Sequence, residues 1–584
     1  MRAIVLVVAD TDVGRLGHRR SLRVPLAGRP VLEHTLRRAA RVEGVDRVVV
    51  VHPPGQTPLD GVETSGLSRP VETFAHPDAA GDGYTPRRRA ARTWALTGWR
   101  GGLGGATAWD ELLPATPLHA AAQAADAQAV VLVGGDWCLF DPGYAGELLR
   151  LHREAPDAMR LTFTQAPPGL GAVVTSTDVL GDLAAKHATI GGALAYQPHR
   201  PAIDPIGREC NLPIPASVRD TARRFIYDAP PGSAVSVGGV SLVEGVAERL
   251  GDAVFDADAV AVTDAARAWE ASRPERVFDT LPEQVTIELT PRRLATGPIV
   301  PQHDVELPRG DMDPALAVEV VKQCAGRAVT LGGLGDATLH PDYAAVVDAA
   351  AGAGVVGLHV ETDLLAERDA LAPLTELPID VVSVRLNADT AATYAEVMGV
   401  DRLPEVMATL QWLFDRRSAG FRGSGRPAGM PWVVPRLVKT SATLGDLETF
   451  FERWMQVVGH AVIERPLTLG RAEDALMPDL SPVPMDPPPR KPRKPRNSPS
   501  LDDPLLVKRR LTVLSDGTVA LCGQDALGRA ALGNVRDRPL AELWAGVPDL
   551  DLPAMGGPAR GVTCRRCYEW WSTVAGRVSS APPA

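Results

Sequence analysis

The stretch AVTLGGLGD, residues 328–336, decides the fold of the longer part of the chain. Its apolar and β-branched residues at 328–331 predict a buried strand, glycines begin the turn that ends it, and Asp336 follows directly. Helix-forming stretches flank it at 314–324 and 341–353. A short buried strand between two helices is typical of a parallel α/β sheet, whose ligands bind at the C-terminal ends of the strands.

This strand–helix alternation recurs on both sides of that stretch. Further strands are predicted at 285–290, 356–361, 381–386 and 432–438, with another helix at 390–398. Repeated βα units over about 200 residues predict a TIM-like barrel, complete or partial.

The N-terminal part is a second α/β module. A strand at 4–8, a helix at 30–40 and a strand at 48–51 form a β-loop-α-β unit, which predicts a parallel open sheet. Another buried strand, 129–134, is followed by Asp136. In open α/β sheets the strand C-termini line the ligand crevice, so Asp136 is a candidate binding residue.

Length and charge limit the classes of function. The 584 residues suggest several domains, and the net charge of −10 opposes binding to nucleic acid or to an anionic membrane. The opening segment is too short and too charged for a signal peptide, and no apolar run reaches the length of about 20 residues that spans a membrane. We therefore expect a cytoplasmic protein whose partners are small molecules, nucleotides, peptides or another protein.

Composition suggests where the modules end. We expect one domain at 1–275, the barrel at 276–480 and a small C-terminal domain at 501–584. Residues 481–500 between them are rich in proline and positive charge, a composition that stays extended and buries no core. They are expected to form a disordered linker.

The cysteines are unevenly distributed. Three of the six, Cys522, Cys564 and Cys567, lie close to the C-terminus, and the last two form a Cys-x-x-Cys pair. In a reducing compartment such thiolates indicate a soft-metal or iron-sulfur site, although three reduced cysteines without a metal are an equal alternative. The other three cysteines are expected to be ordinary buried thiols; they are Cys138, Cys210 and Cys324.

The C-terminal segments resemble the SPASM domain of radical S-adenosylmethionine (SAM) proteins. The resemblance rests on DGTVALC at 516–522, GNV at 533–535, LAELW at 540–544 and CRRCYEW at 564–570. SPASM domains carry auxiliary clusters, so the resemblance implies a [4Fe-4S] cluster or another metal at Cys522, Cys564 and Cys567. The family usually supplies a fourth thiolate upstream, and the stretch 501–511 contains none.

The predicted barrel resembles the radical SAM core. GGLGDATLHP at 332–341 is similar to that family's Gly-Gly-Glu-Pro region, and the strand ends at 361–365 and 380–388 are similar to its next two motifs. The resemblance implies a SAM-binding region at Gly332, Gly333 and Asp336.

The cluster that cleaves SAM has no ligands in this sequence. Radical SAM enzymes carry Cys-x3-Cys-x2-Cys after the first strand, whereas the loop at 291–304 has no cysteine and ends in His303 and Asp304, a pair that either binds some metal or is simply solvated. We therefore expect a relict SAM region that cleaves no SAM.

The first module resembles nucleotidyltransferases with a GT-A-like fold. The match runs through the loop after the first strand and RVPLAGRPVLEH at 23–34. It implies that Gly14, Arg15 and Arg23 bind a nucleotide and that Asp136 holds Mg²⁺. The acidic residues of the loop at 10–13 oppose the approach of a triphosphate, so a scaffold without nucleotide is the alternative.

The order of the three modules resembles the spiro-SPASM proteins. It implies a degenerate radical SAM and SPASM protein that binds a peptide, a ligand or a partner as an accessory protein. The alternative is a Mg²⁺-dependent nucleotidyltransferase or glycosyltransferase that acts through the N-terminal domain.

Overall fold

A computed structural model describes most of the two predicted α/β modules. The described residues are 1–14, 19–79, 115–164, 166–185, 190, 211–219, 223–228, 240–272, 281–282, 284–303, 305–420, 431–458, 461–464, 510–521, 523–529 and 531–545. They divide into two compact units, the first ending at Val277 and the second beginning at Phe278. Each unit has its own hydrophobic core.

The first unit contains a seven-stranded sheet in the order β5-β4-β1-β6-β8-β7-β9. Its strands are β1 (Ala3–Val8), β4 (Arg47–His52), β5 (Val71–Ala75), β6 (Ala129–Gly134), β7 (Leu161–Thr164), β8 (Val173–Ser176) and β9 (Asn211–Leu212). Strand β1 pairs in parallel with β4 and β6, whereas β8 pairs antiparallel with β6 and β7. All six residues of β1 and of β6 are buried, as central strands covered on both faces require.

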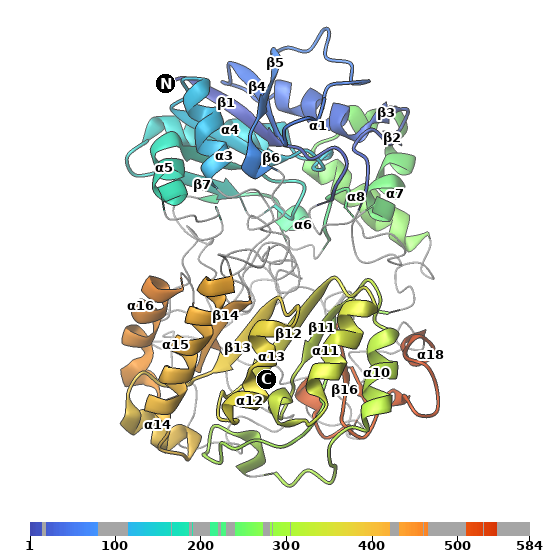
Figure 1. The fold of residues 1–584 in the computed structure, drawn as a ribbon. Helices are drawn as coiled ribbons and strands as arrows, with labels where there is room; N and C mark the ends of the chain where they lie inside the picture. Colours follow the sequence, from blue (N-terminus) through green and yellow to red (C-terminus); the bar gives the residue numbers. More distant parts are fainter. Residues whose placement is uncertain are drawn as a thin grey trace, which may run out of the picture. The chain divides into compact units, whose positions relative to one another are not determined.

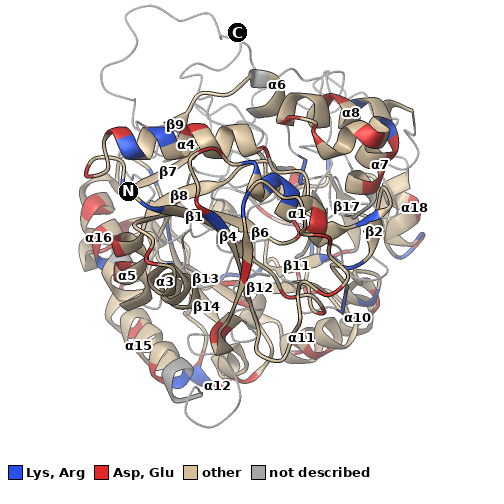
Figure 2. Ribbon diagram, turned by 90° about the horizontal axis from the view of Figure 1, so that it is seen from above, with Lys and Arg blue, Asp and Glu red and all other residues tan. Residues whose placement is uncertain are grey.

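Helices flank the sheet of this unit (Figure 1). They are α1 (Val31–Ala40), α3 (Ala115–Ala124), α4 (Pro142–Glu154), α5 (Thr177–Ala185), α6 (Ala216–Arg219), α7 (Val240–Leu250) and α8 (Ala259–Ala271). Helix α4 begins at a proline, and the Asp141 side chain caps its first turn by accepting from the amides of Gly143 and Tyr144. Residues of both charge signs lie along α4 and α8, where they form ion pairs within each helix (Figure 2).

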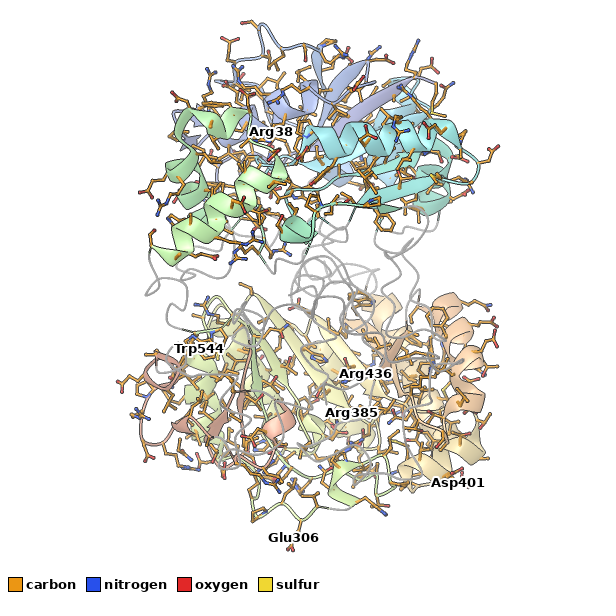
Figure 3. The ribbon with its side chains drawn as sticks, turned by 180° about the vertical axis from the view of Figure 1, so that it is seen from behind. Arg38, Glu306, Arg385, Asp401, Arg436 and Trp544 are labelled. Atoms are coloured by element: carbon orange, nitrogen blue, oxygen red, sulfur yellow. The ribbon has the colours of Figure 1, made fainter. Side chains whose placement is uncertain are left out.

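A buried arginine ties this unit together. Arg38 on α1 is 1% exposed, and its guanidinium donates to the carbonyl oxygens of Phe140, Val254 and Ala257 (Figure 3). Its contacts join the end of the β6 region to the segment that precedes α8, and burial lowers the pKa of Arg38.

The second unit contains a nine-stranded sheet in the order β15-β14-β13-β12-β11-β10-β16-β17-β18. The first six are β10 (Gln284–Ile287), β11 (Ala328–Leu331), β12 (Gly357–Thr362), β13 (Val381–Arg385), β14 (Trp432–Val438) and β15 (Val462–Glu464). They pair in parallel in chain order. Among the described residues these strands form an open sheet, as in a partial barrel, because β10 pairs with β11 and β16, and β15 pairs with β14.

Helices connect these strands as the repeated pattern predicts. They are α10 (Pro314–Lys322), α11 (Tyr343–Gly352), α12 (Arg368–Leu371), α13 (Pro373–Glu376), α14 (Ala391–Met398), α15 (Leu403–Gly420) and α16 (Leu447–Val457). Neighbouring helices pack on one another, α10 on α11 and α14 on α15 (Figure 1). No helix among the described residues combines the length and apolar character needed to cross a bilayer.

The C-terminal segment extends this sheet. Strand β16 (Arg510–Val513) pairs in parallel with β10, and β17 (Thr518–Ala520) and β18 (Gly533–Asn534) follow as antiparallel strands. Helix α18 (Leu540–Ala545) buries Leu540, Leu543 and Trp544. Strands β16 and β17 form a strand-turn-strand, and the pairing of β16 with β10 joins it to the sheet of the second unit.

Candidate ligand site at the strand ends of the second unit

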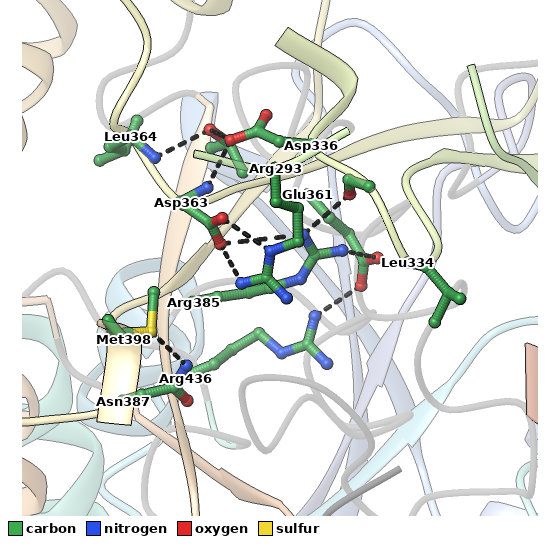
Figure 4. A network of polar contacts seen from close by, with 12 residues as sticks. Arg293, Leu334, Asp336, Glu361, Asp363, Leu364, Arg385, Asn387, Met398 and Arg436 are labelled. Atoms are coloured by element: carbon green, nitrogen blue, oxygen red, sulfur yellow. Dashed lines mark hydrogen bonds and ion pairs between the residues drawn. The ribbon is translucent and has the colours of Figure 1, made fainter. Parts of the chain in front are cut away.

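Charged side chains gather where the parallel strands of the second unit end. They are Glu288 after β10, Asp336 after β11, Glu361 and Asp363 at the end of β12, Arg385 at the end of β13, and Arg436 on β14. All of them except Glu288 are labelled in Figure 4. Parallel pairing places these positions at one edge of the sheet, the edge at which ligands bind in α/β barrels. All are buried or nearly so.

The loop after β10 contributes an arginine to this edge. Arg293 donates to both carboxylate oxygens of Asp363, with Nε–Oδ2 at 2.8 Å and Nη2–Oδ1 at 2.5 Å. The side chains are 5% and 0% exposed. Two parallel charged hydrogen bonds of this kind fix both direction and distance, so the pair holds the first loop onto the end of β12.

A second carboxylate bridges two arginines. Glu361 accepts from Nη2 of Arg385 at 2.8 Å, from Arg436 Nη1, and from the amide of Gly333 at 3.0 Å. Burial by itself would raise the pKa of Glu361, but Arg385 and Arg436 outweigh it and lower that pKa well below its usual range. Glu361 is therefore an anion at any physiological pH.

Asp336 faces neutral donors. One of its oxygens accepts from the amide and hydroxyl of Thr338 at 3.0 and 2.7 Å, and the other from the hydroxyl of Thr362 at 3.0 Å and the amide of Asp363 at 2.8 Å. Burial, followed by the charge of Asp363, raises the pKa of Asp336. Asp336 thus joins the ends of β11 and β12.

The glycine loop after β11 is shaped by its neighbours. A Cβ at Gly332 would lie 2.5 Å from a carboxylate oxygen of Glu361, and one at Gly335 would lie 1.8 Å from the carbonyl oxygen of Thr290. Arg385 donates to the carbonyls of Gly333 and Gly335 at 2.7 and 3.0 Å. The chain's own side chains therefore occupy the polar groups of this loop.

The three residues of the predicted SAM region lie at this edge, but they contact the protein itself. Gly333 donates to Glu361, Gly332 is crowded by the same side chain, and Asp336 caps the following turn through Thr338. The sequence reasoning did not identify the arginines and acids around them; these are Arg293, Glu361, Asp363, Arg385 and Arg436. The sequence feature that could have identified them is a charged residue at the end of a predicted buried strand, as at Glu361 and Arg385.

The loop in which radical SAM enzymes hold their cluster takes a different role here. The amides of Thr296 and Gly297 donate to the carbonyl of Met398 at 2.9 and 2.8 Å, which docks the loop on the end of α14. His303 is exposed and its Nδ1 lies 2.8 Å from the carbonyl oxygen of Thr296, whereas Asp304 lies outside the described residues. A loop without cysteine, anchored by a guanidinium that has only donors, does not fit a [4Fe-4S] cluster.

The residues of the first unit that were predicted to bind a nucleotide contact other parts of the protein instead. Gly14 is buried after β1, Arg15 lies outside the described residues, and exposed Arg23 donates to the carbonyl of Thr57 at 3.0 Å. Asp136 is fully buried, and its Oδ2 lies 3.2 Å from Nη2 of Arg20. An arginine beside a buried carboxylate competes with the Mg²⁺ that the sequence suggested there.

The loop after β1 contains its own anion. Oδ1 of Asp10 accepts from the amides of Asp12 and Val13 at 3.0 and 2.9 Å, and from the Gln56 side chain at 2.8 Å. In the resembled family this loop cradles the nucleotide. The residues here fit a bound nucleotide poorly, because a carboxylate already holds two of the loop amides.

The cysteines fall into two groups. Cys138 and Cys324 are buried free thiols, as predicted, and burial raises the pKa of each to about 12. Cys210 and the three candidate ligands Cys522, Cys564 and Cys567 lie outside the described residues, as does the linker at 481–500. Among the described side chains, no three His, Cys, Asp or Glu residues are grouped so that they could hold a metal ion.

Comparison with known proteins gives a family for the C-terminal segment. Residues 506–568 match the family model of the SPASM domain, described as an iron-sulfur cluster-binding domain. The matched segment includes all three candidate cysteines. An uncharacterized protein of Treponema pallidum (strain Nichols) is 26% identical over 145 residues, which are 25% of this chain and 35% of that protein.

Solved structures of two kinds are similar to the chain. SuiB of Streptococcus suis bound to S-adenosylmethionine is 11% identical with a TM-score of 0.35, covering 57% of this chain and 86% of that one. BtrN in complex with AdoMet and 2-DOIA is 14% identical with a TM-score of 0.29, covering 52% and 97%. A cytidylyltransferase from Leptospira borgpetersenii is 10% identical with a TM-score of 0.28, covering 47% and 97%.

The strand order shows how the matched segment is joined to the second unit. The strands of the matched segment, β16 to β18, continue the sheet of the six parallel strands rather than forming a sheet of their own. The segment that matches the SPASM domain therefore extends the parallel α/β sheet of the second unit.

Proposed function

We propose that this protein is a degenerate radical SAM and SPASM relative that does not cleave SAM and acts as an accessory protein binding a peptide, a small ligand or a partner enzyme. One observation carries the proposal. The loop that would hold the catalytic cluster lacks cysteine, and its Arg293 is instead held by the buried carboxylate of Asp363.

Coordination chemistry supports this proposal. A catalytic [4Fe-4S] cluster needs three thiolates here and leaves one iron open to SAM, whereas arginine offers five N–H donors and no lone pair for a metal. What the strand ends offer is recognition by charge. Guanidinium groups suit carboxylate or phosphate groups of a ligand, which here would have to displace Glu361 from Arg385 or Arg436.

The SPASM segment is proposed to hold the metal. Cys522, Cys564 and Cys567 supply three soft thiolate ligands within the matched segment, which suits an iron-sulfur cluster or another soft metal. Such a cluster would supply electron transfer or a rigid cross-link.

The first unit is proposed to be a scaffold. The Arg20–Asp136 pair and the Asp10 carboxylate in the loop after β1 both favour this role over nucleotidyl or glycosyl transfer.

Anaerobic chemistry tests the central claim. Reconstituted protein incubated with dithionite and SAM is expected to form no 5′-deoxyadenosine above a no-protein control, with an established radical SAM enzyme as the positive control. Formation of 5′-deoxyadenosine by the purified chain would overturn the proposal.

Binding is tested separately. Thermal-shift screens of the full chain against SAM, nucleotides with and without Mg²⁺, and acidic and basic peptides are expected to give a binder that carries a carboxylate or phosphate group. A Mg²⁺-dependent shift with one nucleotide alone would favour transferase activity in the first unit instead.

A further inference from the structure

One carboxylate at the strand ends lies where donors from three segments of the second unit meet. Oε2 of Glu361 accepts from Nη2 of Arg385 at 2.8 Å and from the amide of Gly333 at 3.0 Å, and its Oε1 accepts from Nη1 of Arg436. Figure 4 shows both guanidinium groups beside this carboxylate. Two charged donors and one backbone amide therefore converge on a single carboxylate, and each of its oxygens has a charged partner.

Two of these three donors are positioned by groups other than Glu361. Nη2 of Arg385 also donates to the carbonyl oxygen of Gly333 at 2.7 Å, and its Nη1 donates to that of Gly335 at 3.0 Å. Neutral carbonyls orient a guanidinium without cancelling its charge, so these contacts hold Arg385 in place for an anion. Gly333 has a φ of 106°, which glycine adopts readily and which directs its amide to the same carboxylate.

This group of charges is more open than its neighbour on the same edge. The side chain of Glu361 is 14% exposed, and those of Arg385 and Arg436 are 10% and 13% exposed. The side chains of Arg293 and Asp363 are only 5% and 0% exposed. Solvent therefore reaches the carboxylate of Glu361, whereas the Arg293–Asp363 pair is closed.

We propose that Gly333, Arg385 and Arg436 form a binding site for a ligand carboxylate, and that Glu361 occupies this carboxylate site in the ligand-free chain as an internal competitor. The inference rests on the proposed function, because it names the group that a bound peptide or small ligand presents to the strand ends. A side chain tethered beside its own site competes at an effective concentration on the order of millimolar. A ligand that replaces Glu361 therefore needs further contacts of its own.

Removing the competitor tests the carboxylate site in the full chain. Glu361→Ala deletes a CH2–COO− group, and acetate supplies the same group with one more hydrogen. At matched ionic strength, acetate is expected to raise the melting temperature of Glu361→Ala by about 2 to 4 °C more than chloride does. Acetamide has the same shape without the charge and should give no such rise. Wild type should respond to acetate and chloride alike, because Glu361 holds the site.

Two further variants show whether the response belongs to this site. Arg385→Gln in the Glu361→Ala background should abolish the preference for acetate. Glu376→Ala is the matched control, because it removes the partner of Arg416 from an exposed pair, and it should respond to acetate and chloride alike. A folded Glu361→Ala protein without a preference for acetate, or one that keeps the preference without Arg385, overturns the inference.

The comparison also holds if Glu361→Ala folds poorly. Glu361→Ser leaves nearly the same room beside the two arginines and then takes its place. For either variant, the yield of refolding from urea should be higher in acetate than in chloride of the same ionic strength. Equal yields in the two salts overturn the inference.

Titration calorimetry with succinate tests the competition in the wild-type chain. Its Kd is expected to be at least about tenfold lower for Glu361→Ala than for wild type, because the tethered carboxylate no longer competes. Equal Kd values would show that Glu361 does not compete, and would overturn the inference. Formation of 5′-deoxyadenosine in the SAM assay would overturn the proposed function and leave the acetate and succinate results standing.

Discussion

At the scale of single residues, the second unit depends on charges that are buried and paired. Asp363 is fully buried, holds Arg293 by two hydrogen bonds and lies 3.9 Å from Arg385. Removing one partner of a buried pair leaves an uncompensated charge, which costs far more than losing an exposed pair.

We expect Asp363→Asn to lower the free energy of unfolding by about 3 to 5 kcal/mol, because Arg293 then stays buried without its counter-charge. Urea unfolding followed by circular dichroism measures the change. Glu376→Gln is the matched control, because Glu376 forms an exposed pair with Arg416, and it should cost less than about 1 kcal/mol. Equal losses in both variants would contradict the assignment.

His359 predicts how stability changes with pH. It is buried on β12 between Ser383 and Thr330, and burial lowers its pKa from 6.5 to about 3. The unfolded chain therefore binds a proton below pH 6.5 that the folded chain does not bind until about pH 3. The contribution of His359 is complete above pH 6.5 and is lost as the pH falls toward 3.

Urea midpoints measured between pH 7 and pH 5 test this sign. Wild type should lose stability as the pH falls, by up to about 1.4 kcal/mol per pH unit from this group. His359→Gln should have a flatter profile over the same range. If stability falls with pH as steeply in His359→Gln as in wild type, other titrating groups cause the pH dependence.

At the scale of elements, the first loop and α14 depend on each other. A Cβ at Gly297 would lie 2.3 Å from the carbonyl oxygen of Val397 and 2.4 Å from the amide nitrogen of Gly399, which itself has a positive φ of 71°. Only a residue without a side chain permits this approach. The loop is thus held at one end by Arg293 and along its length by the end of α14.

We expect Gly297→Ala to cost about 1 to 3 kcal/mol in the free energy of unfolding, because backbone must move to accept the methyl group. Gly352→Ala at the end of α11 is the control, since its Cβ would meet nothing within 4 Å and its effect should be neutral or stabilising by up to about 1 kcal/mol. Thermal and urea unfolding measure both variants. A Gly297→Ala protein as stable as the control would show that the loop has room to move.

At the scale of the whole molecule, the metal content of the purified protein can be measured directly. We expect anaerobically purified protein to contain iron or zinc that depends on Cys564 and Cys567, because these thiolates and Cys522 are the only cysteines within the SPASM segment. Elemental analysis of wild type and Cys564→Ala/Cys567→Ala measures it.

The double variant should lose the metal, and Cys324→Ala, which removes a buried free thiol of the same unit, should keep it. Equal metal in wild type and the double variant would place the site elsewhere. No metal in any of the proteins would leave the cysteines as remnants of a lost site.

The sequence by itself determined the local features. The alternation of buried strands and helices, such as 328–331 followed by 341–353, is written in the spacing of apolar residues, and the structure confirms the strand at β11 and the helix at α11 within a few residues. The cysteine-free loop at 291–304 is likewise a matter of residue identity. Such features depend on neighbours in the chain, so periodicity and composition reveal them.

Only the tertiary structure decided which charged side chains form pairs and which strands extend the sheet of the second unit. Arg293 pairs with Asp363 rather than with solvent, Asp136 pairs with Arg20, and β16 joins β10, so that Ser515 reaches Glu288 across 227 positions of sequence. Asp136, predicted as a Mg²⁺ ligand, is buried beside Arg20 for this reason. The strength and role of a charge depend on its burial and on the distance to its partner, and both are set only when distant segments pack together.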